Sequence, residues 1–255
     1  MITNAQIKNI TSLKEKKYRN ISKTFVVEGR KMIEELLKSD YQIINIYALE
    51  SWQKDSFSRI NKYRQQDINN TIITVSEKEL ERISLLKTPD EVLAVVMQKT
   101  IKKIEIAHQL VLALDNINDP GNLGTIIRIA AWFGVNNIVC NNNTVDCYNP
   151  KVLQSTMGAI FHTNILYTDL YSFLCDSDSE NIYGTVLQNG RSIYEENLTA
   201  DGIIVIGNES HGISDKILSI TNRPLSIPSY APDGAIESLN ASIACGIVLS
   251  EFKRR

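Results

Sequence analysis

The run at residues 203–206 constrains the fold most, because it is a short, β-branched apolar stretch that stops at Gly207. A run of this kind, bounded by turn residues, is typical of a parallel strand buried on both faces. Polar residues follow at once, among them Glu209 and His211. In open α/β sheets, ligands bind beyond the carboxyl ends of the strands. The sequence therefore predicts a buried parallel sheet with a site just beyond this strand.

The rest of the carboxyl-terminal half repeats this alternation of strand and helix. Further strands are predicted at 110–114, 137–140, 164–167, 183–187 and 225–227. Helices are predicted between them, at 122–133, at 150–158, at 170–175, from about 214, and at 238–252. Asn122 is a candidate N-cap, and Pro150 suits the first position of its helix. Strands that alternate with helices indicate a parallel sheet.

The first hundred residues predict a smaller α/β module. Ser76 and Glu79 have the spacing of a capping box, which marks the start of a helix. The predicted strands lie at 25–27, 43–49, 71–75 and 92–97, with an amphipathic helix at 29–37. We therefore expect one domain at 1–99, a linker at 100–109 and a second domain at 110–255.

Composition narrows the class of protein. With 43% hydrophobic and 22% charged residues, the chain of 255 residues has the make-up of an ordinary globular protein. It contains no apolar stretch of the ~20 residues that a membrane span needs, and its lysine-rich start lacks the apolar core of a signal peptide. The four cysteines form no C-x-x-C pair, so we expect reduced, mostly buried thiols. These features predict a cytoplasmic protein without a bound metal.

Charge is distributed unevenly along the chain. The formal net charge is -2, yet residues 1–38 contain nine Lys/Arg and four Asp/Glu and so carry +5, which leaves -7 on the remainder. A basic segment of this kind fits a surface that contacts phosphates, and it fits equally well an exposed helix rich in lysine. Both interpretations stay open from the sequence.

Three polar blocks stand in a fixed order along the second half. They are Asn116-x-x-Asp119-Pro120-x-Asn122-x-Gly124-x-x-x-Arg128, then Gly207-x-Glu209-x-x-Gly212, then Ile227-Pro228 followed by Ser238-Leu239-Asn240. This ordered set resembles the SpoU/TrmH family of RNA ribose 2′-O-methyltransferases, part of the SPOUT superfamily. Residues 1–99, including the phrase at 25–29, resemble less specifically the ribosomal-protein-like substrate-binding domain of many members.

The resemblance implies a fold, a cofactor and partners. The fold is a small ribosomal-protein-like α/β domain followed by a SPOUT α/β methyltransferase domain with a parallel sheet and a trefoil knot. The cofactor is S-adenosylmethionine, held by the loops that cross at the knot. Family members work as homodimers on RNA, so we expect a homodimer with an RNA partner and no membrane partner.

The resemblance also implies which residues form the site. Cofactor binding is expected at Gly207, Asn208, Ile227, Pro228 and Leu239, and catalytic roles at Asn122, Arg128, Glu209, Ser238 and Asn240. Arg128 matches the arginine assigned to activating the 2′-hydroxyl. Because a guanidinium has a pKa above ~12, Arg128 acts either as an unusual base or as a bidentate grip on a phosphate. Asn122 and Arg128 are expected on nearly the same side of their helix.

Several residues have a second interpretation. Ser238 and Asn240 are good N-cap residues and fit the start of the last helix as well as a catalytic role. His211 is either a base or an ordinary loop histidine. Two features depart from the family pattern: the stretch 229–237 is a few residues longer than expected, and Ala241 stands where valine is usual.

These blocks predict one function and leave several alternatives. We expect transfer of a methyl group from S-adenosylmethionine to a ribose 2′-hydroxyl of RNA, and ribosomal RNA in particular, since shorter members that act on transfer RNA often lack the amino-terminal domain. The alternatives are transfer RNA as the substrate, or a non-catalytic RNA-binding factor in ribosome assembly. A dinucleotide-dependent oxidoreductase is disfavoured, because no G-x-G-x-x-G follows a candidate first strand.

Overall fold

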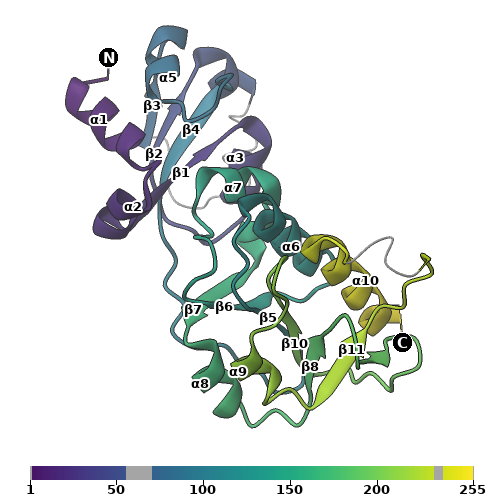
Figure 1. The fold of residues 1–255 in the computed structure, drawn as a ribbon. Helices are drawn as coiled ribbons and strands as arrows, with labels where there is room; N and C mark the ends of the chain where they lie inside the picture. The colour runs from purple at the N-terminus through teal and green to yellow at the C-terminus, as the bar shows by residue number, and fades with distance from the viewer. Residues whose placement is uncertain (1, 56–70, 233–237, 255) are drawn as a thin grey trace. The chain divides into compact units, whose positions relative to one another are not determined.

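The computed structural model describes residues 2–55, 71–232 and 238–254. The chain forms two compact units (Figure 1). Unit 1 comprises Met1–Lys99 and Tyr148–Phe161, and unit 2 comprises Thr100–Cys147 and His162–Arg255.

A mixed four-stranded sheet forms the centre of unit 1, with the strand order β1-β4-β2-β3. Strand β4 pairs antiparallel with both β1 and β2, and β2 pairs parallel with β3. The strand bounds are Thr24–Glu28 for β1, Ile43–Ala48 for β2, Ile72–Thr74 for β3 and Val92–Met97 for β4. All four predicted strands of the small module are therefore present.

Helices cover both faces of this sheet (Figure 1). The helices α1 (Asn4–Ser12) and α5 (Glu77–Ile83) share a core with the sheet residues Val26, Tyr47 and Leu93. The other face receives α3 (Arg30–Leu37) and α7 (Pro150–Thr156), which contact β1. A short helix α2 (Lys16–Ser22) leads into β1, and a 3-10 helix η2 (Ala159–His162) follows α7. The predicted capping box of Ser76 and Glu79 is confirmed at the start of α5.

Unit 2 contains a seven-stranded sheet with the order β7-β6-β5-β10-β8-β11-β9. Every strand pair in it is parallel, which confirms the prediction from alternating strands and helices. The bounds are Leu110–Leu114 for β5, Asn137–Asn141 for β6, Asn164–Thr168 for β7, Ile182–Thr185 for β8, Arg191–Ser192 for β9, Gly202–Ile206 for β10 and Arg223–Ser226 for β11. The central strands β5 and β10 are buried along their whole length.

Two helix layers enclose this sheet (Figure 1). On one face, α8 (Leu170–Cys175) and α9 (Asp215–Leu218) share a core with Val111, Val139 and Val205. The other layer is formed by α6 (Pro120–Trp132) and α10 (Ala241–Arg254), which pack against each other. The ring of Phe252 on α10 meets that of Tyr183 on β8 edge to face, with 4.8 Å between centroids.

The structure corrects several predicted boundaries. Helix α6 begins at Pro120 with Asp119 as its N-cap, so the assignment of that role to Asn122 was wrong. The Asp119 side chain accepts the Asn122 N–H at 2.8 Å, and proline suits the first helical position because it needs no N–H there. The last helix begins at Ala241, not at Ser238. The short strand β9, which the sequence did not predict, lies at the edge of the sheet.

Two predictions concern features that the described residues do not contain in full. The extra length at 229–237 falls mostly on residues 233–237, which lie outside them. The trefoil knot stays a prediction, since the same five residues lead into α10. Within the three described ranges, no helix has the length and hydrophobicity to cross a membrane.

The cysteines agree with the expectation of free, mostly buried thiols. Cys140, Cys147 and Cys245 are buried and Cys175 is exposed, and none of the four is in a disulfide. Burial raises the pKa of Cys140 and of Cys245 to about 12, so both are neutral thiols at physiological pH.

Candidate active site

The topology of unit 2 brings the three polar blocks to one edge of the sheet. Strands β5 and β10 are parallel neighbours in register, so the first and second blocks leave the sheet side by side. Strands β10 and β11 both pair with β8, and the third block begins directly after β11. Because all these strands are parallel, their carboxyl ends lie at the same edge. The sheet order therefore assembles segments that are about 100 residues apart in the chain.

A chain of hydrogen bonds links one residue from each block. The Asn122 side-chain amide donates to Glu209 Oε1 at 2.8 Å. The Asn240 amide donates to Asn122 Oδ1 at 2.9 Å. Asn240 Oδ1 in turn accepts hydrogen bonds from the backbone N–H and the hydroxyl of Ser242. Three of the five predicted catalytic residues thus form one connected group.

Glu209 is oriented by a closed turn. Asn208 and Gly212 exchange two backbone hydrogen bonds of 2.9 Å, and Gly212 has a positive φ of 69°. The Asn208 side chain accepts the N–H groups of Ser210 and His211 and donates to the Asn116 carbonyl at 2.7 Å. This turn fixes the backbone on both sides of Glu209. Asn208 therefore stabilises this turn, and its predicted contact with the cofactor stays a prediction.

Gly207 lies where the backbone of the second block packs most closely against itself. A Cβ at this position would lie 2.2 Å from the Gly212 carbonyl carbon and 2.3 Å from the Ile213 nitrogen, far inside any normal contact. Those neighbours are backbone atoms that cannot rotate away. Only glycine fits where the turn closes back on the end of β10.

Asp115 ties this edge together, although sequence reasoning gave it no role. Its buried carboxylate accepts hydrogen bonds from the side chains of Asn116 (2.9 Å) and Asn141 (3.1 Å) and from the backbone N–H of Ser214 (2.8 Å). Asn116 follows β5, Asn141 is the last residue of β6, and Ser214 follows the turn after β10. The sequence signal was weak, since Asp115 only follows a strand predicted to be buried; its full burial, which for an aspartate requires partners, is visible in the structure alone.

Arg128 and Ser238 stand apart from the connected group. Both are exposed, and neither has a hydrogen-bond or ion-pair partner among the described residues. Six residues advance an α-helix by about 600°, so Asn122 and Arg128 leave α6 about 120° apart. The expectation that they share one side of the helix was wrong. Arg128 is therefore available to a ligand rather than held by the protein.

The predicted cofactor residues after β11 are only partly covered. Ile227 and Pro228 are half-buried, and Leu239 exposes its apolar side chain. Gly190 packs against the end of β11, where a Cβ would lie 2.8 Å from the Leu225 carbonyl carbon. This close approach closes the 186–192 loop over the strand end next to Ile227. The assignment of Ile227, Pro228 and Leu239 to cofactor binding stays a prediction.

The structure leaves the two interpretations of His211 open. The residue is exposed, and its Nδ1 lies 3.2 Å from Asn208 Oδ1. It has no contact with Glu209 or Asn122 among the hydrogen bonds of the described chain. No cluster of His, Cys, Asp or Glu suited to a metal ion occurs in these ranges.

Together, the fold and this site define a class: an α/β protein whose polar groups converge at the carboxyl edge of a parallel sheet. Comparison with known proteins identifies the family. Residues 109–250 match the model of the SpoU rRNA methylase family, and residues 4–94 match the model of the MRM3-like substrate binding domain. The chain belongs to the SpoU rRNA methylase family, which confirms the predicted family and the enzyme class of RNA 2′-O-methyltransferase.

Similar proteins match over nearly the whole chain. The 23S rRNA (guanosine(2553)-2′-O)-methyltransferase RlmP from Bacillus subtilis is 32% identical, covering 98% of this chain and 96% of its own. A TrmH-family protein from Porphyromonas gingivalis has a TM-score of 0.87 at 31% identity, covering 100% of this chain and 99% of its own. An AdoMet-bound rRNA methyltransferase from Sinorhizobium meliloti has a TM-score of 0.85 at 25% identity, covering 100% and 96%.

Proposed function

We propose that the protein transfers a methyl group from S-adenosylmethionine to a ribose 2′-hydroxyl of ribosomal RNA. The hydrogen-bonded group of Glu209, Asn122 and Asn240 carries this proposal, because it joins all three family blocks at one sheet edge. The alternative of a non-catalytic RNA-binding factor does not require such a connected group. S-adenosylmethionine supplies an electrophilic methyl group when bound.

Glu209 and Asn122 orient the nucleophile. Glu209 Oε2 has no hydrogen-bond partner within the described chain, so it is free to accept the ribose hydroxyl. Asn122 holds the carboxylate through Oε1 and is itself held by Asn240. The group lies at the amino-terminal ends of α6 and α10, where helix dipoles favour negative charge. A fixed acceptor of this kind aligns the hydroxyl for in-line attack.

Arg128 is the cation that meets the RNA. It is exposed on α6 and unpaired among the described residues, and its planar fork fits two phosphate oxygens at once. Gripping the phosphate next to the target ribose restricts the position of the 2′-hydroxyl. We therefore assign Arg128 primarily to substrate orientation, with the proton-accepting role as the alternative to be tested.

Cofactor binding is assigned to the loops after β10 and β11. Gly207 lets the turn of the second block close against the end of β10 and so sets the position of this loop, and Ile227, Pro228 and Leu239 offer apolar contacts. We assign the exposed Ser238, three residues before α10, to a contact with RNA or cofactor.

Ribosomal RNA is the proposed substrate because of the first unit. Residues 4–94 match a substrate-binding domain, and the relative RlmP is named for a guanosine of 23S rRNA. RNA exposes its 2′-hydroxyls in loops and shallow grooves, so a separate unit that recognises RNA shape suits this chemistry. We propose residues 1–99 as the RNA-binding domain, 100–109 as a linker and 110–255 as the catalytic domain. A guanosine in 23S rRNA is the first candidate target.

The decisive experiment measures transfer of labelled methyl from S-adenosylmethionine into separated ribosomal and transfer RNA pools. Methylation of a ribose leaves an alkali-resistant linkage, which identifies the product. We expect label in one ribosomal RNA, loss of transfer in Arg128→Ala, and unchanged transfer in the matched control Lys253→Ala. Arg128→Lys retains the charge without the fork and is expected to recover little activity. Absence of transfer to every pool, with RNA binding intact, would refute the enzyme and favour the assembly factor.

A homodimer is proposed through α6 and α10. These adjacent helices carry two strongly exposed apolar side chains, Trp132 (84% exposed) and Ile243 (53% exposed). Large apolar groups at this level of exposure commonly mark interaction surfaces. A second copy of the chain is the proposed partner for this face, and its contact would cover both residues.

Sedimentation tests this dimer directly. Trp132→Lys and Ile243→Lys are expected to yield monomers, because each places a charge in the proposed interface. Leu187→Lys, which alters an apolar residue that is 70% exposed and belongs to neither α6 nor α10, is the matched control. A wild-type chain that sediments as a monomer at micromolar concentration would exclude the dimer.

We place the protein in the cytoplasm. Its proposed substrate is ribosomal RNA, and its four free cysteines fit a reducing compartment. Cell fractionation that finds the protein with the envelope or outside the cell would refute this location.

A further inference from the structure

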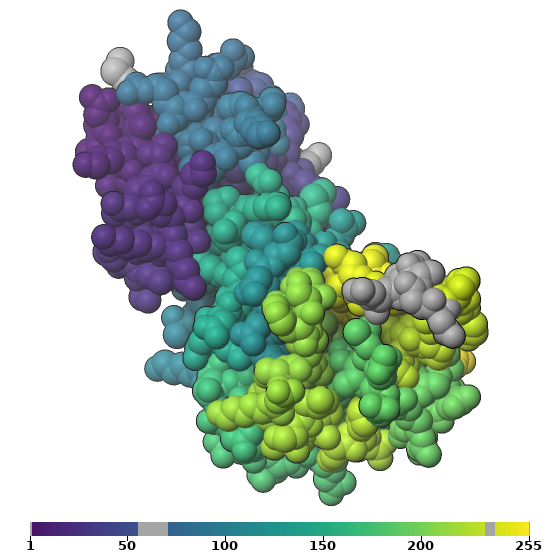
Figure 2. Space-filling view, in the orientation of Figure 1, coloured from purple at the N-terminus to yellow at the C-terminus, as the bar shows by residue number. Residues whose placement is uncertain are grey.

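A groove with a volume of about 440 Å³ opens on unit 1, far from the residues of the candidate active site along the chain. Helices α1 and α2 form one side through Asn9, Tyr18 and Ile21. Strand residues of the sheet, including Asn45 and Tyr47, form the other side. In Figure 2 the amino-terminal segment, coloured purple, makes up much of the visible surface of this unit. The groove is large enough for a nucleotide.

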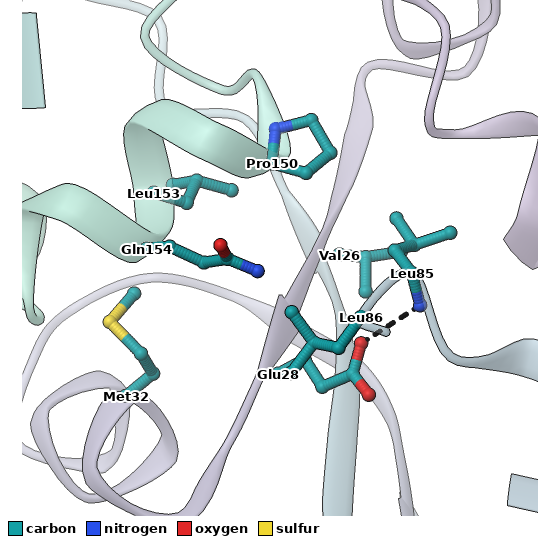
Figure 3. A pocket seen from close by; sticks show the side chains of 8 residues that line it. All are labelled: Val26, Glu28, Met32, Leu85, Leu86, Pro150, Leu153 and Gln154. Carbon is teal, nitrogen blue, oxygen red and sulfur yellow. Dashed lines mark hydrogen bonds between the residues drawn. The ribbon is translucent and has the colours of Figure 1, made fainter. Parts of the chain in front are cut away.

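A second hollow in unit 1 is much smaller, and its polar groups are paired within the protein. It is lined by residues such as Glu28, Met32 and Gln154 and has a volume of about 20 Å³ (Figure 3). That space holds about one water molecule. The Glu28 carboxylate there already accepts hydrogen bonds from Ser84 and Leu85, so its polar groups are satisfied within the protein.

Hydrogen-bonding groups in the large groove lack protein partners. The Tyr47 side chain is only 3% exposed, yet within the described chain its hydroxyl has no hydrogen-bond partner. Burial raises the pKa of Tyr47, so the hydroxyl stays a neutral donor. The Asn45 amide, half-buried on the same strand, is likewise unpaired among the described residues. A neutral donor beside an amide that both donates and accepts matches the edge of a nucleobase.

The opposite side of the groove offers a stacking surface. The Tyr18 ring is 41% exposed and Ile21 is 70% exposed, both on α2. The Lys17 ammonium lies 6.0 Å from the centre of the Tyr18 ring. Exposed aromatic rings beside cations are the usual platforms on which proteins stack unpaired bases.

Positive charge surrounds this surface. Residues 1–24 contain six Lys/Arg and a single acidic residue, Glu15, in a chain whose net charge is -2. The five lysines of this segment are exposed, whereas Arg19 is buried and binds backbone carbonyls of residues 13 and 14. The exposed charges complement a phosphate backbone, which dominates the affinity of proteins for nucleic acids.

We propose that this groove binds an unpaired nucleotide of the RNA substrate, with the base against Tyr18 and its edge at Asn45 and Tyr47, and the adjoining phosphates at the lysines of α1 and α2. The inference rests on the proposed function in that it takes RNA as the substrate. It goes further by assigning the recognition of a single-stranded element to one surface of unit 1. The uneven charge of the chain is thereby explained as a functional feature.

The test compares binding of a short fluorescent single-stranded RNA with binding of the same sequence as a duplex. We expect the full-length protein to prefer the single strand. Tyr18→Ala is expected to weaken single-strand binding about five- to 150-fold, from the typical contribution of one stacked base. Tyr47→Phe removes only a hydroxyl and is expected to weaken it about three- to tenfold. Tyr194→Ala, an exposed tyrosine in unit 2, is the matched control and should change nothing.

A kinetic readout separates this inference from the proposed function. If methylation proceeds, Tyr18→Ala should raise KM for RNA while kcat and S-adenosylmethionine affinity stay constant. Methylation with unchanged KM and unchanged RNA affinity in both Tyr18→Ala and Tyr47→Phe would overturn the inference and leave the enzyme assignment standing. Absence of methylation together with Tyr18-dependent RNA binding would support the inference and overturn the enzyme assignment. Equal affinity for single strand and duplex in the wild type would also overturn it.

Discussion

Replacing Gly207 by alanine tests how the second block is built. The added Cβ would lie 2.2 Å from the Gly212 carbonyl carbon, 2.3 Å from the Ile213 nitrogen and 2.5 Å from the Gly212 oxygen. An ordinary contact starts at 3.4 Å, so the turn must move by about 1.2 Å. All three atoms belong to the backbone, and no rotamer change relieves the clash.

This movement should reduce both the stability of the protein and its affinity for the cofactor. Overpacking of this kind typically costs about 1–3 kcal/mol. For a unit of this size, each kcal/mol lowers the melting temperature by about 2–4 °C, so a drop of roughly 2–12 °C is expected. The displaced turn also carries Asn208 and Glu209, so affinity for S-adenosylmethionine should fall at least about tenfold, which corresponds to about 1.4 kcal/mol.

Two measurements check this prediction, namely the melting temperature by calorimetry and cofactor affinity by titration calorimetry. The matched control is Gly246→Ala in α10, where the new Cβ would lie 3.6 Å from Ile129, an ordinary contact. Alanine in place of a helical glycine is expected to stabilise by about 0.5–1 kcal/mol. If Gly207→Ala retained both the wild-type melting temperature and cofactor affinity, the packing argument and the cofactor assignment of this loop would be wrong.

Three further predictions follow from buried groups of unit 2. Asp115→Asn should lower the free energy of unfolding by about 1–3 kcal/mol, because the new NH₂ group replaces an acceptor. In one orientation it faces the side-chain amides of Asn116 and Asn141, and in the other it faces the backbone N–H of Ser214. An unchanged denaturation midpoint would contradict this. At pH 8, iodoacetamide should modify Cys175 alone in the native protein and all four cysteines after unfolding, as mass spectrometry would show, whereas rapid native labelling of Cys140 would refute its burial. Cys140 and Cys245 have a pKa of about 12 in the folded protein and about 8.5 in the unfolded chain. Their contribution to stability is therefore complete below about pH 8.5 and is lost as pH rises towards 12. The denaturation midpoint should fall across this alkaline range, and a rise would show that the sign is wrong.

Individual elements show how far sequence reasoning reaches. The helix α8 was predicted with its bounds, and the capping box of α5 with its partners, because both depend on neighbouring residues alone. The N-cap of α6 was assigned to Asn122, a residue with the right chemistry in the wrong place. Asn122 is instead engaged by Glu209, which is 87 residues away in the chain. The cap is Asp119, directly before Pro120, so a local signal was passed over, whereas the contact of Asn122 with Glu209 is one that no local pattern predicts.

The sequence by itself determined the alternation of strands and helices, the parallel sheet and the family. Those properties follow from apolar periodicity, from proline and glycine at turns, and from ordered motifs, all of which are local. The tertiary structure alone decided that Glu209, Asn122 and Asn240 form one hydrogen-bonded group while Arg128 is exposed. It also decided that Asp115 joins the ends of β5 and β6 to the segment after β10, and that Gly207 admits no side chain. The reason is physical: strand order and register set which loop ends meet, and each such contact depends on distances of a few ångströms between residues that no local pattern relates.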